Sequence, residues 1–426
     1  MRRIVRRPRR SRFRHGWGVA AVCAYAALIP FQPVLTMPDG SPLRFAAADA
    51  IAPLVLLAAV VAPKRRLPGG LLLTVIGIPL VALLSTLVAA HERELTWYAM
   101  GKTAGLFYLA ALSVAAARSV PRDAGPVVLR ALAFGALWSA VVGLVGYAAW
   151  MVGFPTTLVS TGRLCSTMPG DPNIYCSLLA VGLIVTATET RGSLLARAAS
   201  LAVLVTALVL TGSRSGVVGA GLGLAITLLV RSRDPWLTGA RALYVLLAAG
   251  VVGTVAFLSA PGEIAGDFIY AHASRAWTVD NRFALYTRAL EQFSEHPFLG
   301  LGIGGFNELN TWSMEGPAGH MPVHNTYLWS LVDLGLAGGC LMAGVVAAAI
   351  WRCARAAARR PGSEGAAQVA GALAAMAGFN LFVDGFYQRH LWVLFACAMG
   401  MPLMRRVRRT PVWQWDHEPV AVTATR

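Results

Sequence analysis

The sequence predicts an all-α integral membrane protein with about twelve transmembrane helices. Hydrophobic residues make up 56% of the 426 positions and charged residues only 13%, which is about half the charged fraction of an ordinary soluble domain. The mean hydropathy is +0.59. This composition excludes disordered, collagen-like, coiled-coil and small disulfide-stabilised proteins.

Apolar runs of helix length follow one another along the chain. A bilayer core takes a helix of roughly 20 apolar residues, and a helix satisfies its own backbone polar groups where no water is present. The expected spans are residues 17–36, 45–62, 67–90, 97–117, 126–152, 173–190, 194–211, 214–230, 239–259, 323–351, 364–386 and 389–404.

The basic residues indicate how these spans are oriented. The chain carries 37 Lys and Arg against 20 Asp and Glu, a net charge of +17, and the basic residues gather beside the ends of apolar runs. With the N-terminus in the cytoplasm, most of them fall on the cytoplasmic side, as the positive-inside rule requires. The charge therefore reports topology and gives no support for binding nucleic acid. Both termini are expected in the cytoplasm, and the first span is either a cleaved signal peptide or, as its length favours, an uncleaved anchor.

This topology divides the chain into five parts. A basic cytoplasmic N-terminus (1–16) precedes the first nine spans (17–259), a large extracytoplasmic loop (260–322), the last three spans (323–404) and a cytoplasmic tail (405–426). Within the loop, Asp280 and Asn281 are expected to cap a helix that continues through residues 282–296 and ends at Pro297. Its apolar residues recur at helical spacing, so it is expected to lie amphipathically at the outer membrane surface.

Two patterns that suggest binding sites are discounted. The six cysteines form neither a C-x-x-C metal site nor a disulfide framework, and only Cys165 and Cys176 are candidates for a pair. No metal site is predicted. The G-x-G-x-x-G of Gly300, Gly302 and Gly305 lacks the strand and βαβ unit of a dinucleotide site, so it is interpreted as a flexible turn.

Three ionisable residues near the outer membrane surface are candidates for chemistry. Arg214, in TGSRSG, lies at the expected N-terminus of the eighth span, where a helix end and a guanidinium both favour a phosphate. Arg282 is expected in the first turn of the loop helix, an unfavourable position for a cation. His324 begins the tenth span and could act as a general base. For each, a purely interfacial role with lipid headgroups or neighbouring side chains is the open alternative.

The order and spacing of these residues resemble the O-antigen ligase and polymerase superfamily of bacterial membrane glycosyltransferases. His324, Asn325, Gly335 and Gly338 reproduce its motif of His, then Asn, Ser or Gln, nine residues, and G-x-x-G. Gly339 stands where the family usually has threonine, a departure that weakens ligase against polymerase or protein-directed activity.

Three further segments resemble the family's outer-face motifs. RLCSTMPGDPN contains Arg163, Asp171 and Asn173, TGSRSG contains Arg214, and the large-loop segment beginning DNRF contains Arg282. These matches are sharpest between about residues 160 and 345.

The resemblance implies metal-independent glycosyl transfer at the outer face of the bacterial cytoplasmic membrane, with no cofactor. The donor would be a glycan on undecaprenyl diphosphate, and the acceptor a hydroxyl of a glycan, a lipid or a protein. Arg214 and Arg282 would bind the diphosphate, and His324 would take the acceptor's proton. Substrate-binding roles of second rank are expected for Arg163, Asp171, Asn173, Asn325, Arg288 and Asp384.

Two alternatives remain open at this point. Within the enzyme class, a protein O-oligosaccharyltransferase would use the same donor. From another class, a secondary transporter of a small solute would also have about twelve spans, and Lys102 and Asp384 fall in apolar runs where they could pair or face a cavity.

Overall fold

The computed structural model describes residues 16–36, 42–44, 46–62, 66–91, 96–121, 124–168, 171–231, 276–312, 319–320, 322–359 and 364–401. Within them the chain is almost entirely helical. The helices are α1 (Gly16–Leu28), η1 (Ala47–Ala50), α2 (Ala52–Val61), α3 (Gly69–Ala89), α4 (Trp97–Ser119), α5 (Gly125–Met151), α6 (Pro172–Thr188), α7 (Leu194–Leu210), α8 (Arg214–Arg231), α11 (Ala276–Glu295), α12 (Gly305–Leu309), α13 (Thr326–Arg359), α14 (Glu364–Asn380) and α15 (Arg389–Gly400).

Three two-stranded antiparallel hairpins complete the described structure. They pair β1 (Val34–Thr36) with β2 (Pro42–Arg44), β3 (Val159–Ser160) with β4 (Arg163–Leu164), and β5 (Thr311–Trp312) with β6 (Gly319–His320). All three lie in connections between helices. They therefore shape the loops and leave the body of the protein helical.

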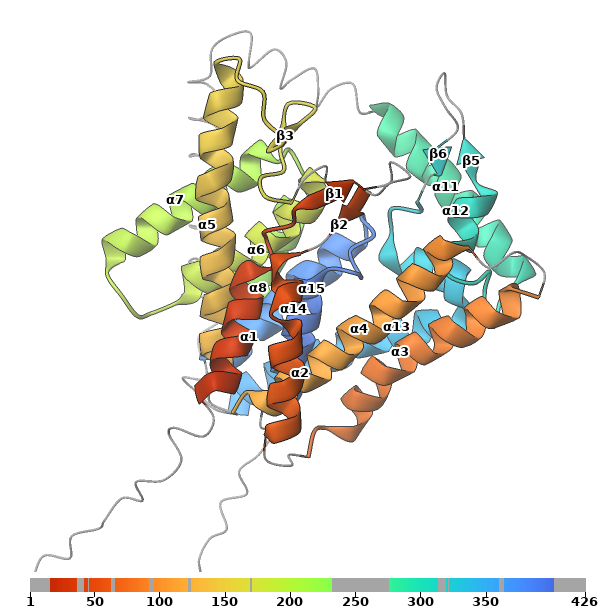
Figure 1. The fold of residues 1–426 in the computed structure, drawn as a ribbon, viewed down its shortest axis with the longest axis horizontal. Coiled ribbons are helices and arrows are strands. Elements are labelled where there is room, and N and C mark those ends of the chain that lie inside the picture. The colour runs from red at the N-terminus through yellow and green to blue at the C-terminus, as the bar shows by residue number, and fades with distance from the viewer. Residues whose placement is uncertain are drawn as a thin grey trace, which may run out of the picture.

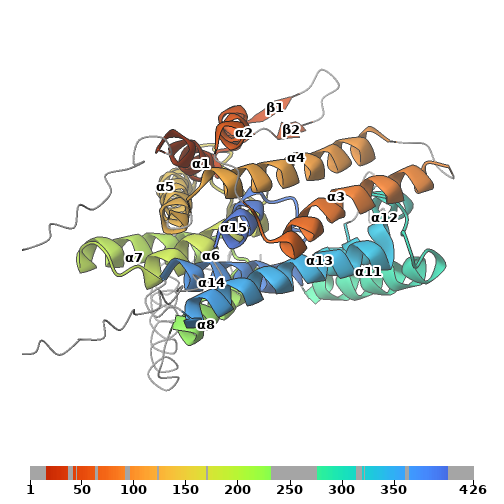
Figure 2. The same cartoon turned by 90° about the horizontal axis from the view of Figure 1, so that it is seen from below.

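The helices pack around a centre formed by α6, α8, α13 and α14. The most extensive packing joins α14 to α8, and α13 packs on both α14 and α3. α4 packs against α2, α3 and α15, while α5 packs against α1 and α6. In Figure 1, α5 stands upright at one side of the molecule, and α3 and α4 cross the other side obliquely. Figure 2 shows α11 running beside the first part of α13.

Five of the described helices are long and apolar enough to cross a membrane. These are α3, α4, α5, α8 and α13, and four shorter apolar helices, α1, α2, α6 and α7, accompany them. Large apolar side chains such as Leu73, Phe134 and Val145 are exposed on the outside of this body, as expected where a protein meets lipid. The predicted helical membrane protein is confirmed. The count of about twelve spans stays a prediction, and the expected span at 239–259 lies outside the described residues.

Three expected spans are shorter than predicted. The first helix ends at Leu28, because Pro30 and Pro33 cannot continue it and residues 34–36 form β1. The second begins at Ala52, since residues 47–50 form the turn η1. α14 ends at Asn380, which places Asp384 in the connection to α15. Apolar composition alone had extended these spans into connecting segments.

The loop helix also begins earlier than predicted. α11 starts at Ala276, so Asp280 and Asn281 lie within it and Arg282 is not in its first turn. The expected end before Pro297 is confirmed, because the helix stops at Glu295. Leu285 and Ala289 are buried, whereas Phe283 and Leu290 are exposed. One face of the helix therefore packs on the body of the protein, and its amphipathic position at the outer membrane surface stays a prediction.

A glycine-rich turn after α11 packs against a kink in α13. Gly335 interrupts α13 with φ of 67° and ψ of −169°, a conformation that only glycine adopts readily. A Cβ atom on Gly335 would lie 2.2 Å from the carbonyl oxygen of Phe298. The turn expected around Gly300 and Gly302 is therefore present, and its neighbours hold it closely.

Candidate active site

One group of predicted residues forms around Arg163 on β4. Its Nε atom donates to the carbonyl oxygen of Thr211 at 2.7 Å, and its Nη2 atom donates to Oδ1 of Asn173 at 2.8 Å. Asp171 caps α6, since its Oδ1 accepts from the backbone N–H groups of Asn173 and Ile174 at 3.0 and 3.1 Å. We refer to Arg163, Asp171, Asn173 and Thr211 as the Arg163 cluster. It joins two segments whose motifs are 48 residues apart.

Arg214 lies next to this cluster as the first residue of α8. Its side chain is exposed, and the turn before it is held by the bond from Arg163 to Thr211. The hydroxyl oxygens of Ser213 and Ser215 are 3.1 Å apart. A Cβ atom on Gly216 would lie only 2.1 Å from the sulfur of Cys176, so α8 and α6 meet closely here. Cys176 and Cys165 are both buried, and the suggested disulfide between them is not formed.

A second group combines α11 with the segment before α13. Tyr286 donates through its hydroxyl to the carbonyl oxygen of His324 at 3.4 Å. The Nε atom of Arg282 is buried and has no hydrogen-bond partner among the described residues. Arg282 is also close enough to His324 to act electrostatically on its imidazole. We refer to Arg282, Tyr286 and His324 as the histidine cluster.

His324 has an unusual environment. Burial, reinforced by the positive charge of Arg282, lowers the pKa of His324 from 6.5 to about 4, because both disfavour an imidazolium. The imidazole is therefore neutral at physiological pH and can accept a proton. Its backbone has φ of 55°, in the left-handed region that costs a non-glycine residue on the order of 1–3 kcal/mol. Such strain concentrates at functional sites.

Asn325 and Arg288 were predicted for the site but are not part of the histidine cluster. The Oδ1 atom of Asn325 accepts from the N–H groups of Tyr327 and Leu328 at 3.0 and 3.1 Å, so its side chain caps α13. Arg288 is exposed on α11. The structure thus gives Asn325 a helix-capping role that explains an asparagine directly after His324.

Asp384 lies in the connection between α14 and α15, outside any helix. Its Oδ1 atom is buried without a hydrogen-bond partner among the described residues. Burial raises the pKa of Asp384, which the nearby positive charge of Lys102 counteracts. The Lys102 ammonium lies 4.3 Å from the ring centre of Tyr387. Lys102 and Asp384 therefore interact electrostatically but do not form a direct ion pair, and Asp384 is in a loop and not within a span.

The connection 381–388 links the two clusters. Thr326, two residues after His324, donates from Oγ1 to the carbonyl oxygen of Val383 at 2.9 Å and accepts from the N–H group of Gly385 at 3.0 Å. Asp384, between these two residues, is in turn close enough to Asp171 to be affected by its charge. The N-terminal ends of α6, α8 and α13 and the connection 381–388 thus share one face of the protein.

Sequence reasoning missed an ion pair on another side of this connection. Arg389 donates from Nε to Oδ1 of Asp49 at 2.8 Å and from Nη2 to Oδ2 at 2.6 Å, and the Tyr108 hydroxyl donates to Oδ1 at 2.6 Å. Asp49 and Arg389 are 340 positions apart. The general rule that charges near membrane depth are paired is the signal that could have found them. The pair fixes the start of α15 to η1 and α4.

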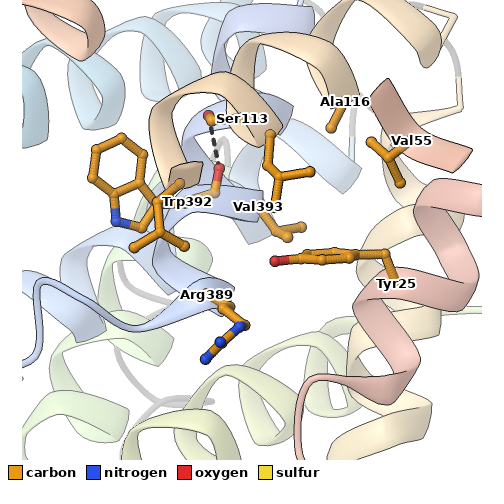
Figure 3. Close-up of a pocket in the computed structure, with 9 residues that line it drawn as sticks. Tyr25, Val55, Ser113, Ala116, Arg389, Trp392 and Val393 are labelled. Atoms are coloured by element: carbon orange, nitrogen blue, oxygen red, sulfur yellow. Dashed lines mark hydrogen bonds between the residues drawn. The ribbon is translucent and has the colours of Figure 1, made fainter. Parts of the chain in front are cut away.

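Arg389 also lines a small, mainly apolar pocket. Figure 3 shows Arg389 and Tyr25 facing this pocket, with Trp392 and Val393 on the same wall as Arg389. Ser113 donates to the carbonyl oxygen of Trp392 at 2.9 Å. The pocket contains none of the residues predicted for the site. We therefore interpret it as a packing feature of α1, α2, α4 and α15.

Comparison with known proteins found a match to one family model. Residues 199–343 match the model of the O-antigen ligase family. This part of the chain is therefore similar to the O-antigen ligase superfamily. A search of curated proteins found no match.

The matched segment contains the histidine cluster and Arg214. Arg163, Asp171, Asn173 and Asp384 lie outside it. The O-antigen ligase family comprises membrane proteins with ligase- or polymerase-like glycan transfer, and the match supports that general type of activity for this chain. The resemblance identified from the sequence is thereby confirmed at the level of the superfamily.

Proposed function

We propose that this protein transfers glycans from a polyprenyl-diphosphate-linked donor, such as undecaprenyl diphosphate, to an acceptor hydroxyl at the outer face of the bacterial cytoplasmic membrane. The observation that carries this proposal is that the charge of Arg282 acts on the imidazole of His324. These residues are 42 positions apart in sequence, yet α11 brings a cation to a neutral, partly buried imidazole.

In this reaction His324 is the general base. The acceptor oxygen attacks the anomeric carbon of the donor sugar, and the hydroxyl proton passes to the imidazole. The bond from the anomeric carbon to the diphosphate oxygen breaks, and polyprenyl diphosphate leaves with its electron pair. The imidazole is unprotonated near neutral pH, which a general base must be before it can take the proton.

Arg282 and Arg214 are proposed to bind the diphosphate. Negative charge grows on the leaving group as the bond breaks, and fixed cations stabilise that charge. Hydrogen bonds to charged groups contribute roughly 1.5 to 3 kcal/mol each. Arg282 supports this role because its Nε donor is buried without a partner among the described residues, and Arg214 because it is exposed at the start of α8. Guanidinium groups provide the neutralisation, so the proposed mechanism needs no metal.

Deletion of the gene, followed by complementation, tests the proposal and identifies the acceptor class. Wild type, His324→Ala and Arg214→Ala are compared by gel separation of surface glycans and lipid-linked intermediates, with His91→Ala as control because His91 is exposed at the end of α3. If the protein is a polymerase, loss of its activity should leave single repeat units on the lipid carrier. If it is a ligase, full-length polymer should stay on the carrier. An unchanged glycan profile in the deletion strain would contradict the proposal and favour transport.

A further inference from the structure

The turn that follows α11 is anchored to one buried carboxylate on α13. Asp333 is 1% exposed. Its Oδ2 atom accepts from the N–H group of Gly304 at 2.7 Å, and its Oδ1 atom accepts from the N–H group of Phe306 at 3.1 Å. Both oxygens are therefore used to hold the backbone at the start of α12. Gly304 has φ of 83°, which positions these N–H groups side by side.

Backbone contacts at the kink reinforce this anchor. Leu301 donates its N–H to the carbonyl oxygen of Val332 at 2.9 Å, and Leu336 donates its N–H to the carbonyl oxygen of Pro297 at 2.7 Å. The Ser85 hydroxyl on α3 lies 2.5 Å from the carbonyl oxygen of Leu299 and 2.7 Å from that of Asp333. The carboxylate, the kink and α3 together hold residues 297–306 in one position.

Asp333 and the histidine cluster lie at opposite ends of the contact between α11 and α13. At one end, Arg282 and Tyr286 of α11 meet His324. At the other, residues 297–306 meet Val332 to Leu336. Thr326 at the start of α13 and Asp333 are seven residues apart, which is roughly 10 Å along the helix. α11 and the first part of α13 therefore run in the same direction and are tied together at both ends.

We propose that Asp333 is a positioning residue that fixes α11 against α13 and so keeps Arg282 beside His324. The inference rests on the proposed function, since it assigns Asp333 a part in that same site. Asp333 touches neither reacting group and acts through the 297–306 turn. Only His296 separates the end of α11 at Glu295 from residues 297–306. A shift of this turn is therefore passed directly to α11.

Two measurements on Asp333→Ala and Asp333→Asn test this role. The first is the pH profile of glycan transfer. If α11 moves away, the charge of Arg282 acts less on His324, and the acid limb should shift to higher pH in Asp333→Ala, in the same direction as in Arg282→Gln. Asp333→Asn keeps one acceptor oxygen and should show a smaller shift. Asp49→Asn is the matched control, because it weakens another carboxylate anchor without contact to α11, and its acid limb should not move.

The second measurement is amide hydrogen exchange of the full-length protein, which does not depend on activity. Asp333→Ala should raise exchange in residues 297–306 and also in 282–295, whereas Asp49→Asn should leave both segments unchanged. Faster exchange confined to 297–306, or an unmoved acid limb in an active Asp333→Ala protein, would overturn the positioning role. If His324→Ala retains transfer, the proposed function fails, and the exchange of 282–295 still decides whether Asp333 holds α11.

Discussion

The Arg163 cluster and the histidine cluster each contain an arginine, but the two guanidinium groups are engaged differently. Arg163 donates to Thr211 and Asn173, so its guanidinium joins α6 to the turn before α8. In the histidine cluster, the buried Nε of Arg282 has no partner among the described residues, and the imidazole of His324 is neutral. The difference suggests that the first cluster builds the face and the second performs chemistry on it.

The largest effect is expected at His324. Removal of the general base in His324→Ala should lower the transfer rate by about 10²- to 10⁴-fold, with little change in thermal stability. Transfer is measured in membranes with a labelled lipid-linked glycan, and His91→Ala serves as control. Near-normal transfer by His324→Ala would remove the base from the mechanism.

A somewhat smaller loss is expected at Arg282. Arg282→Ala should lower the transfer rate by about 10²- to 10³-fold, as for the loss of one donor that stabilises developing charge. The melting temperature should change little, because the described structure gives its Nε no partner to lose. A large drop in melting temperature with proportional loss of folded protein would instead make Arg282 structural, and the contrast between the clusters would disappear.

Replacement of Arg163 should reduce stability more than it reduces the transfer rate. Arg163→Ala removes two charge-assisted hydrogen bonds and should cost roughly 3 to 6 kcal/mol of stability, measured by thermal unfolding in detergent. The transfer rate per folded molecule should fall less than in Arg282→Ala. If Arg163→Ala abolishes transfer while stability is retained, the Arg163 cluster binds substrate directly.

Arg288 is expected to give the smallest effect. It lies on the same helix as Arg282, but its side chain is exposed. Arg288→Ala should therefore change stability by less than roughly 0.5 kcal/mol, as surface substitutions away from special features do. The amount of folded protein is then unchanged, and the transfer rate should stay within about twofold. A loss as large as that of Arg282→Ala would show that the whole exposed face of α11 contacts substrate.

Local sequence patterns predicted the positions of the helices well but not how the helices pack against one another. Apolar runs and Pro297 gave the correct positions of α3 to α8 and the end of α11, because these depend on hydropathy and on backbone chemistry. The start of α11 was wrong because Asp280 resembles a cap, and only the structure shows the helix continuing through it.

Long-range contacts were beyond such reasoning. Asp49 and Arg389 form a bidentate pair across almost the whole chain, and Asp333 looks like any acidic residue within an apolar run until the turn at Gly304 is brought to it. The G-x-x-G motif after His324 acquires a physical reason only from the kink at Gly335, where the backbone of Phe298 leaves no room for a side chain.

The pH dependence of transfer by wild type and Arg282→Gln tests the central claim most directly. The claim is that His324 is the general base and that its pKa, about 4 in the intact protein, is lowered by burial and further by the charge of Arg282. Removal of the cation favours the imidazolium, so the acid limb should move to higher pH in Arg282→Gln, toward the unperturbed value of about 6.5. Superimposable acid limbs for the two proteins would contradict the account.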